Sequence, residues 1–306
     1  MRPRFSIIIT CYNQSAFITD AVNSALAQPA EFKEIIVVDD ASTDGSHGIL
    51  KEYGDKILLA AFKTNQGANI ARNLGAAMAS GEYFVFLDGD DALMPWALEV
   101  YDRIVELKRP KIILSTMSWF DGALSAAKPE ETPHEIRFAE YDFLIHRNRH
   151  YQAGASAMVI QNQAFQEVKG WTADLFPLED VDMLMKLGYS GLAIQVLSPS
   201  TKRYRIHGDN TRHQVPRMIE GLYTVIDKEK SGLYPGGVRR QFDRYAILGS
   251  PVRFWIKSAY QAGLYRDAAR VFSKGWLMFL AASFRKLKTA ILGHGQTGSV
   301  PFESRL

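Results

Sequence analysis

Short apolar runs alternate with helix-length segments through the first 115 residues, and this alternation restricts the fold more than any other feature of the chain. The apolar runs lie at residues 5–9, 34–39, 56–62, 83–88 and 111–115, and the segments between them at 15–27, 45–53, 67–80 and 95–108. Strands that are apolar throughout and joined through helices are typical of a parallel sheet covered on both faces. We therefore expect an α/β fold with a mainly parallel sheet.

Polar residues stand at the ends of three of these apolar runs. Thr10 follows the first run, Asp39 and Asp40 end the second, and residues 88–91 end the fourth. In open α/β sheets, ligands bind at the carboxyl ends of the strands. The sequence therefore predicts that these residues belong to one site.

Three aspartates, Asp88, Asp90 and Asp91, lie within four positions of one another. Like charges this close repel, so a nearby cation would stabilise them. Mg²⁺ and Mn²⁺ prefer oxygen ligands, and they keep open positions for phosphate oxygens when only one or two carboxylates bind them. In an isolated loop the same residues would form a solvated turn, so the metal hypothesis depends on the rest of the site.

The pattern changes after residue 120. Residues 121–150 indicate a polar, loop-rich insertion with a short helix near 140–147. Beyond it we expect a strand at 154–160, a helix with an acidic start at 178–188, a polar strand and loop at 201–213, and amphipathic helices through 214–292. The Gly- and Ser-rich residues 293–306 predict a flexible tail.

Composition limits the class of protein. The chain has 306 residues, 47% of them hydrophobic and 23% charged, which suits one large α/β domain or a domain with an appendage. Cys11 is the only cysteine, so we expect a buried core residue rather than a disulfide or a nucleophile. The sequence contains neither a secretory leader pattern nor a run of about 18 apolar residues, and we expect a cytoplasmic protein.

The net charge of +3 conceals two regions of opposite sign. Residues 1–200 contain 17 Lys and Arg against 26 Asp and Glu, whereas residues 201–306 contain 19 against 7. A basic amphipathic helix can lie on an anionic membrane, so the helices of the basic region predict a peripheral membrane contact. The alternative is that their apolar residues pack against the α/β domain.

Four segments in order, "IIITCYN", "IIVVDDASTDGS", "TNQGANIARNLGAAMASGEYFVFLDGDD" and "PLEDVDMLMKLG", resemble the inverting family-2 glycosyltransferases of the GT-A fold. The resemblance covers roughly residues 4–208. It implies a GT-A domain over 1–213, followed by a basic helical region with a flexible tail over 214–306. It also implies transfer of a sugar from a nucleoside diphosphate sugar, most often a UDP-sugar, with Mn²⁺ or Mg²⁺ as cofactor, in surface polysaccharide or glycolipid synthesis.

The resemblance also implies roles for individual residues. Asp180 matches the catalytic base, and its neighbour Glu179 would orient the acceptor. The metal would be bound by Asp88, Asp90 and His207, and the nucleotide contacted by Thr10, Tyr12, Asp39, Asp40, Arg72 and Asp88. Simple chemistry agrees, because a cation stabilises a departing diphosphate and a positioned carboxylate activates a hydroxyl.

Each role has a structural alternative. Asp180 could only cap a helix start, where aspartate is favoured, and Arg72, Tyr12 or His207 could serve packing or ion pairing alone. For the whole chain, the alternative is a glycosyltransferase-like protein that has lost turnover and acts as a scaffold. We expect a sugar or a lipid-linked glycan as acceptor and no nucleic-acid partner.

Other nucleotide-binding and aspartate-dependent enzymes fit less well. A dinucleotide-dependent oxidoreductase would have G-x-G-x-x-G after the first strand, where this chain has "TCYN". A haloacid-dehalogenase-type phosphatase would have paired aspartates there, and a sugar-nucleotide pyrophosphorylase a Gly-rich basic loop. The first strand therefore excludes all three classes.

Overall fold

A computed structural model describes residues 4–29, 33–124, 132–142, 154–188, 191–208, 214–292 and 297–302 of the chain. Its strands are β1 (Phe5–Cys11), β2 (Lys33–Asp39), β3 (Leu58–Ala61), β4 (Tyr83–Asp88), β5 (Ala92–Leu93), β6 (Ile112–Leu114), β7 (Met117–Asp121), β8 (Glu135–Asp142), β9 (Met158–Gln161), β10 (Leu192–Ser198), β11 (Lys202–Ile206) and β12 (Thr297–Pro301). Its α-helices are α1 (Ile18–Leu26), α2 (Ser46–Lys51), α3 (Ala68–Met78), α4 (Ala97–Lys108), α5 (Asn162–Glu167), α6 (Glu179–Leu187), α7 (Val215–Lys230), α8 (Gln241–Gln261) and α9 (Tyr265–Leu292). The helices and strands expected in the first 115 residues are confirmed.

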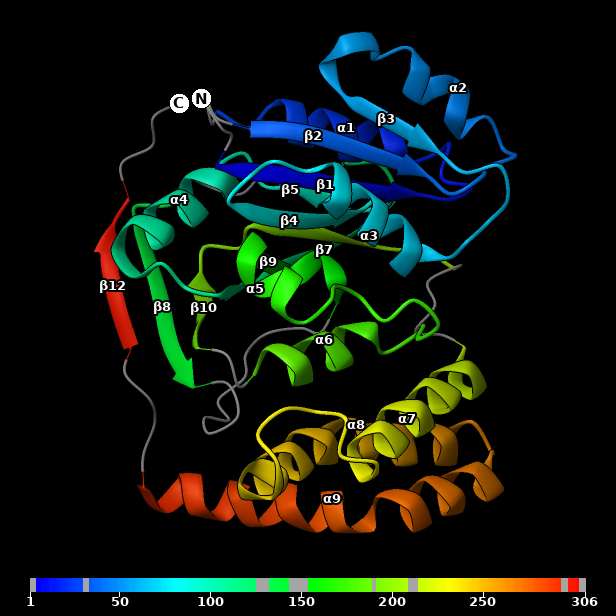
Figure 1. Ribbon diagram of the computed structural model, residues 1–306, viewed down its shortest axis with the longest axis vertical. Coiled ribbons are helices and arrows are strands. Elements are labelled where there is room, and N and C mark those ends of the chain that lie inside the picture. The colour runs from blue at the N-terminus through cyan, green and yellow to red at the C-terminus, as the bar shows by residue number, and fades with distance from the viewer. Residues whose placement is uncertain are drawn as a thin grey trace.

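The main sheet has nine strands in the order β12-β8-β10-β6-β9-β4-β1-β2-β3 (Figure 1). Among the described strands of this sheet, β8 and β9 run against the rest, which are parallel to one another. A smaller sheet contains β5, β11 and β7. The α/β fold with a mainly parallel sheet is therefore confirmed.

Two expectations for the less regular segments are wrong. Residues 140–142 belong to β8 rather than to a helix, because they pair with β10; residues 143–150 of the expected helix lie outside the described residues. The tail was expected to be flexible, yet residues 297–301 form β12 on the open edge of β8. Its Gly and Ser content hid the apolar residues Val300 and Phe302, which pack into the core.

The register of the central strands brings the polar strand ends together. Thr10 lies opposite Val38 of β2 on one side and Asp88 of β4 on the other, and Cys11 lies opposite Asp39. Since β1, β2 and β4 are parallel, their carboxyl ends meet at the same edge of the sheet. The predicted common location of these residues is confirmed.

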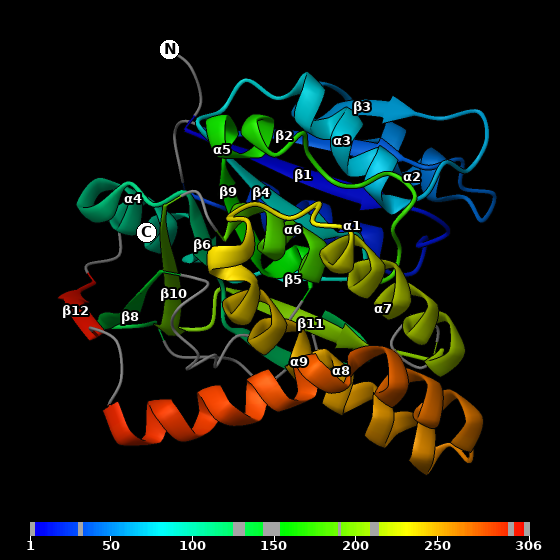
Figure 2. The same ribbon diagram turned by 60° about the horizontal axis from the view of Figure 1, so that its bottom comes forward.

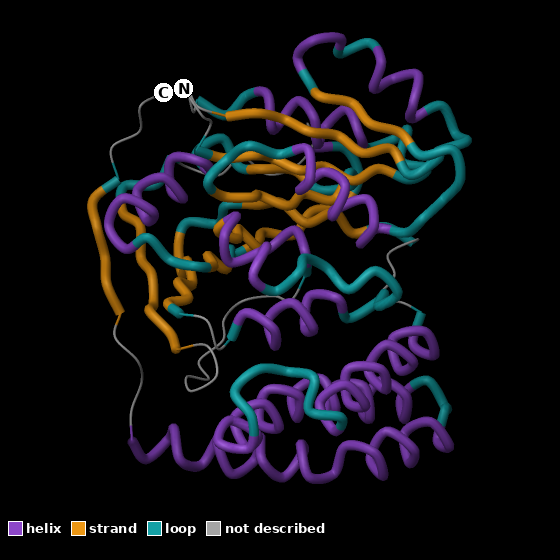
Figure 3. Tube along the Cα trace, viewed as in Figure 1, coloured by secondary structure: helices purple, strands orange, loops and turns teal. Residues whose placement is uncertain are grey.

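Helices cover both faces of the main sheet (Figure 3). Ile7 and Val85 on one face pack with residues of α1 and α4, whereas Phe84 on the other face joins a core that includes residues of α6, α7, α8 and α9. Figure 2 shows α8 and α9 side by side, and they cross closely because Gly249 has no side chain: a Cβ there would lie 2.1 Å from the carbonyl oxygen of Met278. The C-terminal helices therefore pack onto the α/β core. The domain boundary at residue 213 remains a prediction.

A buried carboxylate ties α6 to this helical region. Asp182 is 1% exposed and accepts hydrogen bonds from the hydroxyls of Thr172 and Tyr234, each at 2.7 Å, and from the Lys228 ammonium of α7. Burial opposes ionisation of Asp182, but Lys186 and these donors outweigh it and lower its pKa. Asp182 therefore fixes the position of the helix on which Glu179 and Asp180 stand.

We predict that Asp182→Ala lowers the free energy of unfolding by about 3–5 kcal/mol, because it leaves a partly buried ammonium and two hydroxyls without their acceptor. Urea denaturation at pH 7 measures this change. The matched control is Asp227→Ala, which removes an exposed partner of Lys274 and should cost about 0–1 kcal/mol. Equal effects of the two substitutions would contradict the structural role of Asp182.

Candidate active site

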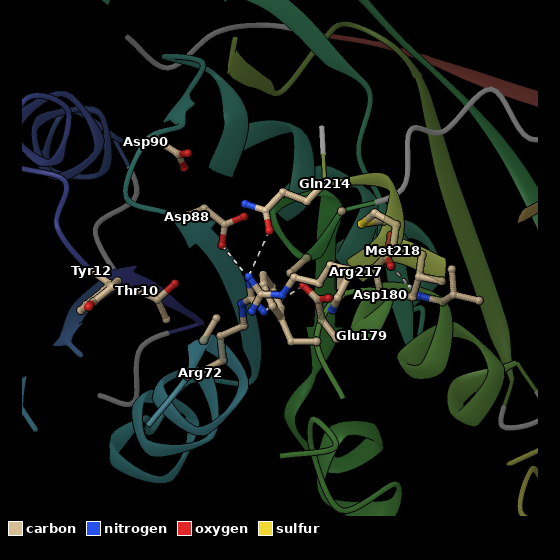
Figure 4. A pocket seen from close by; sticks show the side chains of 18 of the residues that line it. Thr10, Tyr12, Arg72, Asp88, Asp90, Glu179, Asp180, Gln214, Arg217 and Met218 are labelled. Carbon is tan, nitrogen blue, oxygen red and sulfur yellow. Dashed lines mark hydrogen bonds and ion pairs between the residues drawn. The ribbon is translucent and has the colours of Figure 1, made fainter. Parts of the chain in front are cut away.

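A cavity of about 1260 Å³ opens at the carboxyl edge of the parallel strands. Thr10 near the end of β1 and Tyr12 just after it lie on one side of the cavity, and Glu179 and Asp180 begin α6 on the other (Figure 4). Of the predicted site residues, the lining includes Thr10, Tyr12, Asp40, Arg72, Asp88, Asp90, Glu179, Asp180 and His207. The fold thus brings into one cavity all of the predicted residues except Asp39.

Arg72 lies at the centre of the site and connects three elements. Its side chain is 4% exposed on α3, and its guanidinium donates hydrogen bonds to Asp88 of β4 at 2.8 Å and to Glu179 of α6 at 3.2 Å. The guanidinium also lies 5.3 Å from the centre of the Trp171 ring. Arg72 is a buried structural cation, so its ion-pairing alternative is supported, and a direct nucleotide contact remains a prediction.

The carboxylates around Arg72 differ in their protonation. Burial favours the neutral form of Asp88, but Arg72 outweighs it and lowers the pKa of Asp88. Burial raises the pKa of Glu179 to about 7, although Arg72 opposes the shift. Burial also raises the pKa of Asp180. One cavity therefore holds an ionised carboxylate beside two that hold their protons more tightly, an arrangement typical of acid–base sites.

Asp180 is 7% exposed, and one of its carboxylate oxygens accepts the N–H of Val181 at 2.8 Å. This hydrogen bond occupies one of the free backbone N–H groups at the start of α6, as the capping alternative predicts. Asp180 nevertheless lines the cavity. Asp182, two residues further along, is instead occupied by its buried network. Of these two aspartates, Asp180 is the one placed to accept a proton from a ligand.

The pair formed by Asp90 and His207 is the best candidate for a metal site. Oδ2 of Asp90 lies 2.9 Å from Nε2 of His207, and both residues line the cavity with Asp88. In the described parts of the chain, no group of three His, Cys, Asp or Glu side chains is already assembled around a metal position. Mg²⁺ or Mn²⁺ commonly takes one or two carboxylates and fills its remaining positions with water and phosphate oxygens. The residues present fit such a cation.

Gly89 allows the loop of residues 88–91, which we call the aspartate loop, to fold tightly against β1. Its N–H donates to the carbonyl oxygen of Thr10 at 3.0 Å. A Cβ at this position would lie 2.9 Å from the same oxygen and 2.2 Å from the side chain of Gln14. Any larger residue would therefore displace Asp88 and Asp90 from their places at the end of β4.

Sequence reasoning missed two buried cations on β11. The Lys202 ammonium donates to the carbonyl oxygen of Phe86 at 2.5 Å, and burial lowers its pKa to about 7, although Asp91 and Asp88 oppose the shift. Arg205 donates to the Asp90 carbonyl oxygen at 2.9 Å and to the Asp20 carboxylate at 2.7 Å. The only sequence signal was the alternation of basic residues in "TKRYRIH".

The three clustered aspartates thus have different environments. Asp88 pairs with Arg72 and Asp90 with His207. Asp91 is 1% exposed, and its Oδ1 accepts the backbone N–H of Arg205 at 3.1 Å. Burial and the neighbouring carboxylates raise the pKa of Asp91. The cluster contains two cavity residues and one buried structural residue.

The two aspartates at the end of β2, Asp39 and Asp40, mainly hold loops. One oxygen of Asp39 accepts the N–H of Ser42 at 3.1 Å, and the other lies 2.9 Å from Nδ1 of His47. Asp40 lines the cavity, and its carboxylate accepts the N–H groups of Gln66 and Gly67 at 2.7 and 2.8 Å. Nucleotide contacts by Asp39 and Asp40 remain predictions, and Asp39 would act through the loop that it holds.

The chain is similar in sequence to known glycosyltransferases. The profile of Glycosyl transferase family 2 matches residues 6–164. An uncharacterized glycosyltransferase of Rickettsia prowazekii, RP339, is 42% identical over 258 residues, in an alignment that covers 80% of each chain. The putative teichuronic acid biosynthesis glycosyltransferase TuaG of Bacillus subtilis is 41% identical over 93 residues, 29% of this chain and 37% of that protein. Against an uncharacterized glycosyltransferase of Nostoc, alr2836, the match spans 37% of the relative's length.

Solved structures show the same fold at low sequence identity. Residues 1–349 of TarS from S. aureus, in complex with UDP, align with a TM-score of 0.57 at 18% identity over 99% of both chains. The mannosyltransferase PcManGT from Pyrobaculum calidifontis, in complex with GDP-Man and Mn²⁺, aligns with a TM-score of 0.57 at 14% identity, over 94% of this chain and 88% of that one. The sequence profile and the similarity to RP339 over 80% of each chain together show that this chain belongs to glycosyl transferase family 2.

Proposed function

We propose that this protein is an inverting, metal-dependent glycosyltransferase that moves a sugar from a UDP-sugar to an acceptor hydroxyl, with Asp180 as the catalytic base. The main observation is the arrangement of the cavity: Asp180 stands on the side opposite Thr10 and Tyr12, with Asp88 and Arg72 between them (Figure 4). Inversion by direct displacement requires one base on the face opposite the leaving group. A single cavity with diphosphate-binding residues and a separate carboxylate supports that geometry.

The donor would lie against the ends of β1 and β4. Tyr12 is 48% exposed and can stack on the uracil ring, and Thr10 and Asp40 offer polar atoms beside it. Asp88, Asp90 and His207 would bind Mn²⁺ or Mg²⁺. The bound cation would supply positive charge to the departing diphosphate. The solved TarS structures with UDP and UDP-GlcNAc, and PcManGT with GDP-Man and Mn²⁺, support this type of donor and cofactor.

The acceptor would approach from α6. Asp180 would take the proton of the attacking hydroxyl, and Glu179 would orient the acceptor. The Arg72 guanidinium holds Glu179 in place from behind, while Asp182 anchors the helix. The similarity to TuaG supports a role in polysaccharide or glycolipid synthesis for the cell surface.

The first test separates the base from the metal-binding residues. A panel of nucleotide sugars in a thermal-shift assay identifies the donor, because a ligand of the folded state raises the midpoint. With that donor and Mn²⁺, Asp180→Asn should lower sugar transfer or UDP release at least about a hundredfold, because general-base catalysis contributes roughly 10²–10⁴. UDP affinity should change little.

The contrasting variant is Asp90→Ala, which should weaken UDP binding and turnover together and respond only partly to extra Mn²⁺. Full activity in excess chelator would refute the metal role. An Asp180→Asn protein that transfers sugar at the normal rate would place the base elsewhere, and one that loses UDP binding would make Asp180 structural. Wild-type protein that binds a UDP-sugar but never releases UDP would support the inactive scaffold instead.

The raised pKa values of Glu179 and Asp180 predict an acid limb in the activity profile. The base must be ionised to accept a proton, so activity should be full at alkaline pH and fall as pH decreases, with a midpoint above the ordinary range of aspartate. The apparent value belongs to the coupled pair, which faces Arg72 and Asp88. In Glu179→Gln the limb should move to lower pH, because a neighbouring carboxylate is gone. A limb near pH 4, the ordinary range of aspartate, would contradict this prediction.

We also propose that the outward surface of α9 attaches the protein to an anionic membrane. Six side chains form this surface, each at least 46% exposed: Phe272, Trp276, Leu277, Leu280, Phe284 and Leu287. Arg270 and Lys286 are exposed beside them, and Asp267 is the only acidic residue of α9. Within the described residues, no helix is both long and apolar enough to cross a membrane. The expected cytoplasmic location remains a prediction.

The packing alternative holds for the inner side of the same helices, where Trp255 is buried in the core. On the outer side, Leu280→Ser should weaken binding to anionic liposomes about tenfold, since burying a leucine side chain contributes roughly 1.5–3 kcal/mol. Liposome cosedimentation at low salt measures it. Leu233→Ser is the matched control, because Leu233 is 67% exposed but lies outside α9. Failure of the wild-type protein to bind anionic liposomes would exclude the membrane contact.

A further inference from the structure

The cavity does not end at Asp180 but continues between α6, α7 and α8. Six of its lining residues form this extension, which we call the helical trough: Leu184, Met218, Ile247, Pro251, Phe254 and Trp255. None of these side chains carries a charge. The donor half of the cavity, by contrast, is lined by aspartates, Thr10, Arg72 and His207. One continuous cavity therefore has a polar half and an apolar half, and Glu179 and Asp180 lie where they meet.

The trough has a buried floor and an open wall. Ile247 is 2% exposed and Trp255 is 5% exposed, so both are fixed by the core beneath them. Phe254 is 59% exposed, and its ring meets that of Trp255 edge-on at 4.9 Å. Binding sites are typically concave and mostly apolar, with a few polar groups that fix orientation. The trough has this form, whereas a nucleotide or a bare sugar would leave most of its apolar surface unused.

A cation stands at the junction of the two halves. Arg217 is exposed in the first turn of α7 and lines the cavity. Its guanidinium lies 5.2 Å from the centre of the Phe176 ring, and Nη1 lies 3.4 Å from Oε1 of Gln214. Among the described residues, no carboxylate lies within ion-pair distance of it. Figure 4 shows Gln214, Arg217 and Met218 on the same side of the pocket as Asp180.

We propose that the helical trough is the acceptor subsite, and that the acceptor is an amphiphile whose apolar chain lies in the trough. A phosphate or similar anionic group would link the chain to the hydroxyl-bearing part and pair with Arg217. The hydroxyl would then point to Asp180. This assignment rests on the proposed glycosyltransferase function and specifies its acceptor class.

Three features favour this occupant over a purely polar glycan. The trough residues line the same cavity as the proposed base, Asp180. Arg217 complements an anion at the point where the apolar lining ends. The trough is also built from α8, which packs against α9, the proposed membrane-binding helix. An acceptor held in a membrane by its chain would meet both surfaces of one helical hairpin.

The test uses n-decyl phosphate, n-butyl phosphate and 1-decanol as probes, below micelle-forming concentrations, with UDP and Mn²⁺ present. Titration calorimetry should show decyl phosphate binding at least about a hundredfold more tightly than butyl phosphate, because six more methylenes are buried. Phe254→Ser should weaken decyl phosphate binding at least about fivefold. Arg217→Gln should weaken decyl phosphate but leave decanol unaffected.

The matched control is Phe284→Ser, because Phe284 is 66% exposed on α9 and lies outside the cavity. It should leave decyl phosphate binding unchanged, and thermal midpoints should show that both serine variants remain folded. Equal affinity for the two alkyl phosphates, or loss of binding in Phe284→Ser alone, would overturn the proposal, as would an Arg217→Gln protein with normal decyl phosphate affinity. Absence of UDP binding in the wild-type protein would instead refute the donor assignment, and the alkyl phosphate titration would still decide the trough.

Discussion

The active-site cavity depends on the buried guanidinium of Arg72. Without it, the carboxylates of Asp88 and Glu179 would lose the cation that they share. With it, α3, β4 and α6 are joined through one planar group whose several N–H donors reach both carboxylates. A lysine could not replace it, because an ammonium is a compact point charge without that fixed planar geometry. The cation thus sets the distance between the donor half of the cavity and the start of α6.

The aspartate loop after β4 shows how several charges can be held in a small space. Each of its three carboxylates has a separate neighbour, and the backbone is fixed by Arg205 of β11 and by the close approach of Gly89 to β1. Lys202, buried beneath the loop, donates to the carbonyl oxygen of Phe86 and does not enter the cavity lining. The loop is therefore preorganised by protein groups, and an incoming cation would replace the contact between Asp90 and His207. Preorganisation of this kind lowers the free-energy cost of binding.

The features of the fold and the site that the sequence could predict were those set by residues close together in the chain. Local apolar patterns located the parallel strands, and strand direction then placed Thr10 and Asp88 together. The buried network of Asp182 could not be predicted, because its partners lie 10, 46 and 52 residues away and their pairing follows from helix packing. Strand β12 was missed because a sheet edge can recruit a short segment whose own composition is weakly strand-like. The apolar trough was missed because it forms only where α6, α7 and α8 converge.

The two sides of the α8–α9 hairpin explain why the C-terminal region is both apolar and basic. A helix that only packed on the core would need one apolar stripe, yet α9 buries Val271 and Met278 while Trp276 and Leu280 remain about half exposed. Exposed apolar area of this extent is unfavourable in water unless something covers it. A membrane would cover the outer stripe, and an apolar acceptor chain would cover the trough formed by α8. The outer surface of α9 would then bind the membrane, and the trough would bind a chain that comes from it. The hairpin would thereby place the hydroxyl of a membrane-held acceptor next to Asp180.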